Sequence, residues 1–245
     1  MNKINILNTT IDNLSMQETL QIVDHTIMKG EQLHHVVVNA GKIVSMQNDL
    51  QLRKSVNESD LINADGQAVV WASVILGNPL KERVAGIDLM IRLVKLSHKN
   101  NYKIFFFGAK QEVVKSVVDK YTNEYTSDII AGYRNGYFKK EEEQDIAREI
   151  SNSGANILFV AINSPTKENF LYENKNLLKK VNFIMGVGGS FDVVAGHVKR
   201  APLWMQNTGL EWFYRFSQEP RRMWKRYLIG NVKFIILVIK SRVFK

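Results

Sequence analysis

Short apolar runs alternate along most of the chain with longer segments of helical spacing. The runs are rich in β-branched or aromatic residues and are flanked by turn formers, so they predict buried strands: His35–Val38, Lys103–Phe107, Ile157–Ala161 and Phe183–Val187. The helical spacing predicts helices over Ser15–Met28, Ile87–His98, Gln111–Tyr121 and Glu141–Ser151. Ser15 and Glu18 have the spacing of a capping box at the start of the first helix. This alternation favours an α/β, Rossmann-like layered fold with a largely parallel sheet.

Loops that combine glycine with polar residues follow the short apolar segments. Ligands bind at the carboxyl ends of the strands in parallel sheets, so candidate chemistry belongs in these loops. The loops are Asn39–Gly41, Asn63–Gly66, Glu82–Gly86 and Gly188–Asp192.

Composition excludes several classes of protein. The 245 residues suit one large domain or a domain with an appendage, and they include no cysteine. A disulfide scaffold, a thiolate zinc site and a cysteine nucleophile are therefore excluded. The first residues lack the apolar core of a secretory signal, and the longest apolar run, Phe234–Ile239, is too short to span a bilayer. We expect a protein that is not integral to a membrane.

Charge divides the chain near residue 198. Residues 1–198 carry no net charge, whereas residues 199–245 carry all of the net charge of +9. We therefore expect an α/β domain over 1–198, which would carry any catalytic site, and a basic, helical appendage over 199–245. The appendage is also rich in aromatic and aliphatic residues, which favours contact with phosphate, lipid head groups or nucleic acid over a merely solubilising tail.

Common catalytic and metal-binding motifs are absent from the sequence. No phosphate-binding Walker motif, dinucleotide fingerprint or HExxH motif occurs. His34 and His35 would point to opposite faces of a strand, so a core or surface role is favoured over a shared metal. The sequence contains no Asp-x-Asp pair, so it shows no carboxylate clamp for a metal-bound diphosphate.

Five segments together resemble the WecG/TagA/CpsF glycosyltransferases, glycosyltransferase family 26. They are NADGQAVV (63–70), ERVAGIDLM (82–90), FFFGAKQEVV (105–114), GVGGSFDVVAGHVKRAP (186–202) and GLEWFYRFSQEPRRMWKRYL (209–228). The resemblance implies an inverting transferase that needs no metal or cofactor. It would act peripherally at the cytoplasmic face of the bacterial plasma membrane.

The resemblance also implies the substrates. The donor would be a UDP-sugar, commonly UDP-N-acetylmannosamine or its uronic acid, and the acceptor a polyprenyl-diphosphate-linked saccharide. The product would enter teichoic acid, enterobacterial common antigen, capsule or exopolysaccharide synthesis. Val37 and Lys167 depart from the Thr and Gln of the family pattern near the presumed sugar site, so the donor sugar stays open.

Asp65 resembles the family's proposed catalytic base. An inverting transfer needs a group that takes the proton of the acceptor hydroxyl, and Asp65 lies on a loop after the apolar segment Leu61–Ile62. The alternative is that Asp65 only caps the helix predicted over Gly66–Leu76.

Without a metal, cations and backbone amides must meet the charge of the leaving diphosphate. Our candidate donor-binding residues lie in the polar loops and at the start of the appendage: Asn39, Arg83, Tyr137, Gly188, Gly189, Ser190, Asp192, Lys199 and Arg200. Two alternatives stay open, since Arg83 could pair locally with Glu82 or Asp88, and the glycine loop could be only a tight strand exit. Asn39 and Tyr137 could equally be structural.

The appendage predicts a route to a lipid substrate. Arg215, Arg221 and Arg222 are candidates for the acceptor diphosphate. Basic residues at positions 222, 226, 233 and 240 would share one helical face unless Gly230 and Asn231 break the helix. Together with the apolar residues around them, they indicate a helix lying on anionic lipid, and a homo-oligomer could also cover the apolar side chains.

A nucleic-acid-binding protein and a non-catalytic membrane scaffold are the rival classes. The neutral body argues against nucleic acid, and the Asp65 and Arg83 loops argue against a scaffold.

Overall fold

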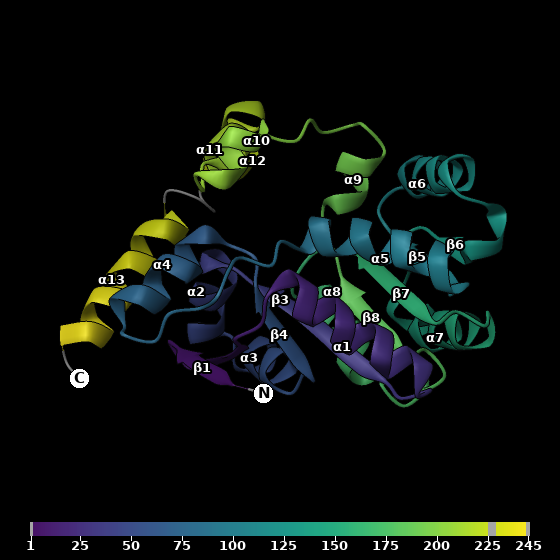
Figure 1. Cartoon of the computed structure of the whole chain (residues 1–245), viewed down its shortest axis with the longest axis horizontal. Coiled ribbons are helices and arrows are strands. Elements are labelled where there is room, and N and C mark those ends of the chain that lie inside the picture. Colours follow the sequence, from purple (N-terminus) through teal and green to yellow (C-terminus); the bar gives the residue numbers. More distant parts are fainter. Residues whose placement is uncertain (1, 225–228, 244–245) are drawn as a thin grey trace.

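The computed structural model describes residues 2–224 and 229–243, and its centre is a six-stranded parallel sheet (Figure 1). The strand order is β4-β3-β8-β7-β5-β6. The strands are β3 (Leu33–Val38), β4 (Leu61–Ala64), β5 (Ile104–Gly108), β6 (Ile130–Arg134), β7 (Ile157–Ala161) and β8 (Phe183–Gly186). The predicted α/β fold with a parallel sheet is confirmed, and each predicted strand corresponds to one of these six.

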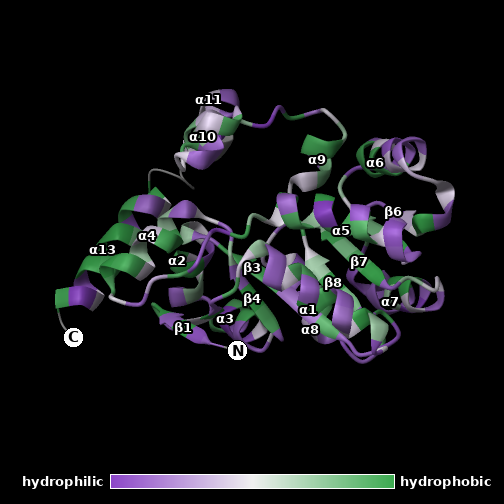
Figure 2. Ribbon diagram, viewed as in Figure 1, coloured by the Kyte–Doolittle hydropathy of each residue, from purple (hydrophilic) through white to green (hydrophobic). Residues whose placement is uncertain are grey.

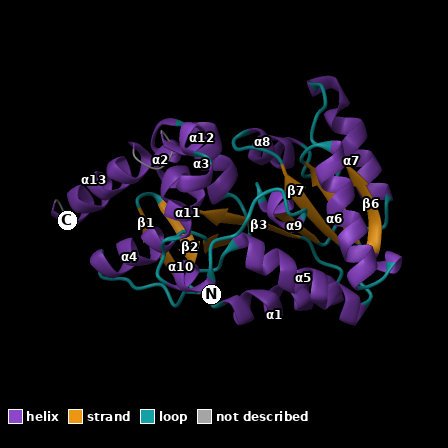
Figure 3. Ribbon diagram, turned by 90° about the horizontal axis from the view of Figure 1, so that it is seen from above, coloured by secondary structure: helices purple, strands orange, loops and turns teal. Residues whose placement is uncertain are grey.

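Helices cover both faces of the sheet, as Figure 3 shows from above. Helices α1 (Met16–Met28), α5 (Gly86–Asn100) and α6 (Gln111–Glu124) pack on one face. Helices α2 (Ala40–Asn48), α3 (Leu50–Asn57), α7 (Glu143–Asn152) and α8 (Thr166–Glu173) pack on the other. Short 3-10 helices, Ser127–Ile129 and Lys140–Glu142, precede β6 and α7. The predicted helices are confirmed, including the reciprocal capping box of Ser15 and Glu18.

Apolar side chains alternate between the two faces of each central strand. Phe106 of β5 packs among α5 and α6, whereas Phe105 and Phe107 pack on the α7 and α8 side. All three are buried, because a parallel sheet with helices on both faces leaves neither side of a central strand in water. This explains why the strands read as continuous apolar runs.

A hairpin that the apolar pattern did not predict extends the fold at the N-terminus. Strands β1 (Lys3–Ile6) and β2 (Thr9–Asp12) pair in an antiparallel manner through Leu7 and Asn8, which both have positive φ. The buried Asp12 carboxylate accepts a hydrogen bond of 2.8 Å from the backbone N–H of Ile62 in β4. The hairpin is thereby joined to the end of the sheet.

Residues after β8 form short helices and one longer one. They are α9 (Ser190–Val194), α10 (Leu203–Asn207), α11 (Glu211–Gln218), α12 (Pro220–Trp224) and α13 (Gly230–Val243). Helix α13 packs beside α2 and α4 (Gln67–Ile75), where Phe234 and Val238 are buried (Figure 1). These two residues complete the apolar cluster around α2, and the division of the chain near residue 198 stays a prediction.

Helix α13 has a second, exposed apolar side. Ile235, Ile236 and Ile239 are about half exposed, and Figure 2 shows α13 as largely hydrophobic. Lys233 and Lys240 lie on this helix, which begins at Gly230, whereas residue 226 of the predicted basic face lies outside the described residues. Within residues 2–224 and 229–243, no helix is long and apolar enough to cross a membrane.

Two adjacent histidines of β3 make stability depend on pH. Burial lowers the pKa of both His34 and His35 to about 4, and the imidazole of His35 lies 2.9 Å from the Asn63 side-chain oxygen. Unfolded histidine binds a proton at about pH 6.5, so the unfolded chain takes up more protons between about pH 6.5 and 4. We therefore expect the free energy of unfolding to fall as pH falls through this range.

Urea titrations at a series of pH values measure this slope. The double variant His34→Gln/His35→Gln should show a flatter dependence than the wild type between pH 6.5 and 4. The control His98→Gln changes an exposed histidine on α5 and should keep the wild-type slope. An equal slope in the wild type and the double variant would contradict the assignment.

Candidate active site

Two polar loops leave the sheet side by side at the ends of β3 and β4. Val38 pairs with Ala64 in parallel register, so Asn39 and Asp65 follow at neighbouring positions. The N–H of Asp65 donates to the Val38 carbonyl at 2.9 Å. A Cβ at Gly66 would lie 3.2 Å from the Cβ of Asn39, so the glycine permits this close approach. The predicted Asn39 and Asp65 loops thus form one site.

The chain that leaves this edge runs to both faces of the sheet. After β3 it enters α2 on one face. After β4 and α4 it returns past the strand end, where the Val84 N–H donates to the Ala64 carbonyl at 2.9 Å, and then enters α5 on the opposite face. The carboxyl edge is the usual ligand position in such sheets. We use the word crevice for the region at this edge around the loops Asn39–Gly41, Asn63–Gly66 and Glu82–Gly86.

The Asp65 carboxylate is held by the start of α5. Its Oδ1 accepts a hydrogen bond of 3.1 Å from the N–H of Gly86, the first residue of that helix. Burial raises the pKa of the Asp65 carboxyl, while the Gly86 hydrogen bond and the Arg83 charge oppose the rise. A carboxylate with a raised pKa is a better proton acceptor than an ordinary aspartate.

The alternative that Asp65 caps the following helix is wrong. Helix α4 begins at Gln67 with Gly66 as its N-cap, and no side chain makes a capping bond there. The carboxylate turns toward α5 because the returning chain brings the Gly86 N–H to it.

Arginines of the crevice pair with carboxylates from distant parts of the chain. Arg83 Nη1 lies 3.0 Å from Glu211 Oε2 of α11. Arg200 binds both oxygens of Asp88 at 2.6 and 2.8 Å, and its Nε lies 3.5 Å from Glu211 Oε1. The alternative of local pairing for Arg83 is therefore wrong: Arg200 takes Asp88, and Glu82 accepts from the backbone N–H of Met16. The network joins the residues after 198 to the Asp65 crevice.

The glycine loop after β8 lies next to Arg215. Gly188 has a φ of +53°, and a Cβ at Gly189 would lie 3.4 Å from Arg215 Nη2. The Ser190 hydroxyl donates to the Val187 carbonyl at 2.7 Å, and the Asp192 carbonyl accepts from two N–H groups that follow α9. The loop is thus a tight strand exit whose outer side faces an arginine.

Other predicted site residues lie outside this group. Tyr137 is 71% exposed and follows β6, the edge strand opposite β4. Lys199 is exposed, and its carbonyl accepts from the Gln218 side chain at 3.1 Å. Arg221 is exposed on α12, and the side chain of Arg222 lies outside the described residues. Among the described residues, the groups that act on the Asp65 carboxylate are Gly86, Arg83, Glu211 and Arg215, and they do not include Tyr137, Lys199 or Arg221.

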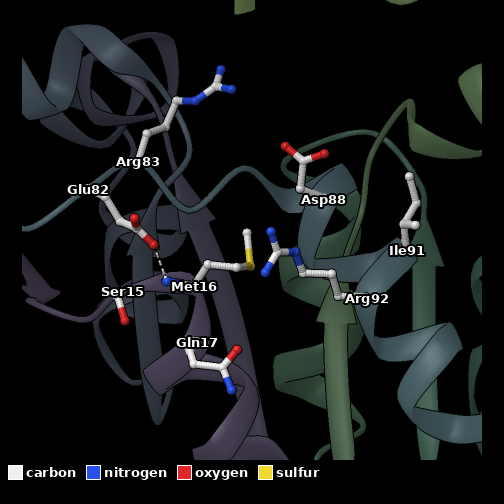
Figure 4. A pocket seen from close by; sticks show the side chains of 8 residues that line it. All are labelled: Ser15, Met16, Gln17, Glu82, Arg83, Asp88, Ile91 and Arg92. Carbon is white, nitrogen blue, oxygen red and sulfur yellow. Dashed lines mark hydrogen bonds between the residues drawn. The ribbon is translucent and has the colours of Figure 1, made fainter. Parts of the chain in front are cut away.

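A cavity of about 440 Å³ adjoins the arginine network (Figure 4). Arg83 and Asp88 belong to the arginine network and also line the cavity. Glu82 and Met16, which are hydrogen-bonded to each other, line it beside α1. The cavity thus lies between α1, α5 and the loop that precedes α5, and Asp65 is not among its lining residues. The lining residues are Ser15, Met16, Gln17, Glu82, Arg83, Asp88, Ile91 and Arg92.

One cluster of charges escaped sequence reasoning. Lys42 of α2 and Lys167 of α8 both approach Glu168, and all three side chains are largely buried. Only the departure at position 167 hinted at it, because 126 residues separate Lys42 from Glu168. His34 and His35 are buried in β3 as expected. Among the described residues, no group of three His, Cys, Asp or Glu side chains could hold a metal ion.

Comparison with known proteins identifies the class of protein. Residues 4–245 match the WecG/TagA/CpsF family of glycosyl transferases, and the chain belongs to this family. It is 36% identical over 217 residues to the N-acetylglucosaminyldiphosphoundecaprenol N-acetyl-beta-D-mannosaminyltransferase of Bacillus subtilis (strain 168). The matched residues make up 85% of this chain and 83% of that relative. The enzyme of the same name from Bacillus spizizenii is 34% identical over 196 residues, with coverage of 80% and 74%. The chain is therefore a glycosyltransferase, and the scaffold and nucleic-acid alternatives lose their basis.

Replacing Asp65 should stabilise the fold. A raised pKa means that folding favours the neutral carboxyl, so the ionised form costs stability as pH rises through that pKa. Asp65→Asn removes the charge and keeps an oxygen for the Gly86 N–H. We expect the melting temperature at pH 7 to rise by about 2–4 °C, which corresponds to about 1 kcal/mol.

Thermal unfolding followed by circular dichroism tests this at pH 7 and at acid pH, where the difference should shrink. Glu31→Gln is the control, because that side chain is exposed in the loop between α1 and β3, outside any helix, and should leave the melting temperature unchanged. A lower melting temperature for Asp65→Asn would show that the carboxylate stabilises the fold.

Proposed function

We propose that the enzyme transfers a sugar, N-acetylmannosamine or its uronic acid or another hexose, from a UDP-sugar to a polyprenyl-diphosphate-linked saccharide. The reaction inverts the anomeric centre without a metal. The activity for which the two Bacillus relatives are named supports an acceptor of N-acetylglucosaminyl-diphosphoundecaprenol type and an N-acetylmannosaminyl donor. The observation that carries the mechanism is the Asp65 carboxylate at the crevice beside Arg83 and Gly86.

Asp65 acts as general base in this proposal. The Gly86 N–H orients Oδ1, and partial burial gives the carboxylate the basicity to accept the proton of an acceptor hydroxyl. The hydroxyl oxygen then attacks the anomeric carbon from the face opposite the nucleotide. The C–O bond to the diphosphate breaks, and UDP leaves.

Arginines and backbone amides meet the charge of the departing diphosphate. Arg215, a candidate for the acceptor diphosphate on sequence grounds, lies beside Gly189. We propose instead that this guanidinium and the glycine loop share one phosphate of the donor. Arg83 and Arg200 stand next to them, paired with Glu211 and Asp88. The donor diphosphate would compete with Glu211 and Asp88 for the two arginines. After the reaction, the same carboxylates would compete with UDP and so favour its release.

The proposal assigns the lipid-linked substrate to the side of the molecule with α4, α10 and α13. Helix α4 contacts α13, and a Cβ at Gly209, after α10, would lie 3.3 Å from the Trp71 ring of α4. These helices carry large apolar side chains that are about half exposed or more: Trp71, Val74, Ile75, Leu203, Trp204, Val232, Ile235, Ile236 and Ile239. Lys233, Lys240 and Arg242 supply positive charge on α13. This mixture suits peripheral contact with anionic lipid at the cytoplasmic membrane face.

The same helices link membrane contact to the site. Glu211 and Arg215 of α11 lie at the crevice, and α11 stands between α10 and α12 in the chain. Docking of the apolar side on a bilayer would therefore change the positions of α11 residues next to Asp65. Arg221 and Arg222 are proposed to meet the acceptor diphosphate, and a homo-oligomer stays a prediction.

Asp65→Asn should abolish most turnover while the donor still binds. Loss of a general base costs about 10²–10⁴-fold in rate, whereas the neutral amide keeps the shape of the site. The assay uses UDP-N-acetylmannosamine with a short-chain lipid-diphosphate N-acetylglucosamine, and calorimetry measures UDP binding. Asp145→Asn should behave as the wild type. Near-normal turnover of Asp65→Asn would remove Asp65 from the mechanism.

Ile235→Glu/Ile239→Glu should weaken membrane binding without unfolding the protein. Both side chains are exposed on one side of α13, whereas Phe234 and Val238, which hold the helix to the core, are unchanged. We expect co-sedimentation with phosphatidylglycerol vesicles to fall at least tenfold, and turnover on full-length lipid acceptor to fall with it. Met28→Glu/Leu50→Glu, at exposed apolar positions of α1 and α3, is the control. Equal vesicle binding by both double variants would contradict this surface.

A further inference from the structure

Four charged side chains form a chain of alternating sign beside the crevice. Arg83 Nη1 lies 3.0 Å from Glu211 Oε2, and Glu211 Oε1 lies 3.5 Å from Arg200 Nε. Arg200 in turn donates to both carboxylate oxygens of Asp88, at 2.6 and 2.8 Å. Glu211 therefore links two arginines, and both ends of the chain of charges lie on the segment that runs from Arg83 to Asp88.

The segment between Arg83 and Asp88 carries the amide that holds the proposed base. Gly86, two residues before Asp88, donates its N–H to Asp65 Oδ1 at 3.1 Å. Helix α5 begins at Gly86, and its N-cap Ala85 makes no side-chain capping bond. The ion pairs on either side of Gly86 therefore contribute the restraint that a cap would otherwise give to the start of this helix.

The four side chains are shielded enough from water for these pairs to fix geometry. Their exposed fractions are 17% for Arg83, 28% for Glu211, 21% for Arg200 and 33% for Asp88. Exposed pairs contribute little, whereas a network of shielded pairs that includes a two-pronged arginine–carboxylate contact contributes more. In Figure 4, Arg83 and Asp88 both point away from Gln17 of α1, so one segment of the chain can reach both.

Glu211 also brings negative charge to a site with several arginines. Among the described residues, the charged groups that act on the Asp65 carboxylate are Arg83, from the loop before α5, and Glu211 and Arg215, from α11. Burial is the main cause of the raised pKa of Asp65, and the charge of Glu211 adds to it. The Gly86 hydrogen bond and the charges of the two arginines oppose the rise. Because a carboxylate with a low pKa is a poor proton acceptor, the charge of Glu211 favours a base at this position.

A purely structural role for Glu211 is the alternative. Glu211 lies in the first turn of α11, where a negative charge stabilises a helix. Such a role would affect the melting temperature, and it would leave the ionisation of Asp65 and the rate of the chemical step unchanged. The two roles therefore differ in what a substitution at this position does to the pH dependence of turnover.

We infer that Glu211 is a positioning residue for the transfer reaction. By binding Arg83 and Arg200 together, it fixes the Gly86 amide. Its charge also limits the positive potential around Asp65. The inference rests on the proposed function, because it assumes that Asp65 is the base. In this role Glu211 contacts neither the substrates nor the reacting atoms, and one ion pair still holds the segment while a donor phosphate competes for the arginine of the other.

Glu211→Gln removes the charge and keeps the size of the side chain. Sugar transfer from UDP-N-acetylmannosamine is measured with the full chain at a series of pH values, and calorimetry measures UDP binding. We expect kcat to fall about ten- to a hundredfold, as for a displaced catalytic group, and the acid limb of the kcat profile to move to lower pH. UDP should bind as tightly as to the wild type or more tightly, because Arg83 and Arg200 lose a competing carboxylate.

Two further variants separate the charge of Glu211 from its contacts. Glu211→Asp keeps the charge but is too short to bridge both arginines, so kcat should fall while the acid limb stays at its wild-type pH. Asp88→Asn weakens the pair with Arg200, and Asp88 is not among the charges that act on Asp65. We expect a lower kcat and an unchanged acid limb for this variant as well.

Glu112→Gln is the matched control. Glu112 is an exposed carboxylate in the first turn of α6, as Glu211 is in the first turn of α11. The control variant loses the same favourable interaction with a helix N-terminus, so its melting temperature can fall, but its kcat and its pH profile should match those of the wild type.

The outcomes that overturn the inference are distinguishable from failure of the proposed function. If Glu211→Gln keeps the wild-type kcat and pH profile and only melts at a lower temperature, Glu211 is structural and the proposed function stands. An equal shift of the acid limb in Glu211→Gln and Asp88→Asn would attribute the shift to loosening and not to charge, which also overturns the inference. If the wild type uses no UDP-sugar, the proposed function fails and the inference fails with it. Should Glu211→Gln not fold, Glu211→Asp decides, and a wild-type kcat in that variant counts against the inference.

Discussion

The parallel pairing of β3 with β4 is the constraint on which the site depends. It sets Asn39 beside Asp65, and the close approach of Gly66 to Asn39 keeps the two loops in contact. The return of the chain past Ala64 then brings the Gly86 N–H to the Asp65 carboxylate. A carboxylate that is partly removed from water and held by one amide is unfavourable for folding and suitable for accepting a proton.

Charge around the crevice is balanced in two different ways. On the α5 side, Arg83 and Arg200 are matched by Glu211 and Asp88, in pairs that join segments 128 and 112 residues apart. On the α2 and α8 side, Lys42 and Lys167 both approach the buried carboxylate of Glu168. The ion pairs on the α5 side hold the C-terminal helices next to the Asp65 loop, and the buried ion pairs on the other side join α2 to α8.

Helix α13 contributes both to the buried core and to the exposed apolar surface. Phe234 and Val238 face α2 and complete its apolar cluster, while Ile235 and Ile239 remain exposed. The run Phe234–Ile239 covers more than one side of a helix, so one part can be buried in the protein while the other stays available to lipid. The same chain segment thus belongs to the fold and to the surface for which we propose membrane contact.

The amino-acid sequence alone determined the layered α/β fold, because strands buried on both faces must be apolar throughout and amphipathic helices must alternate with them. It also determined the Asp65 and Asn39 loops, since polar residues after such strands gather at one edge. The β1–β2 hairpin could not be predicted from the sequence, because a strand of four residues is too short to show a clear alternation of apolar and polar side chains. Tertiary structure alone decided that Asp65 faces α5 and that Arg83 meets Glu211. It also decided that Lys42 and Lys167 share a carboxylate, because an ion pair depends on distance in space, which residue spacing along the chain does not reveal.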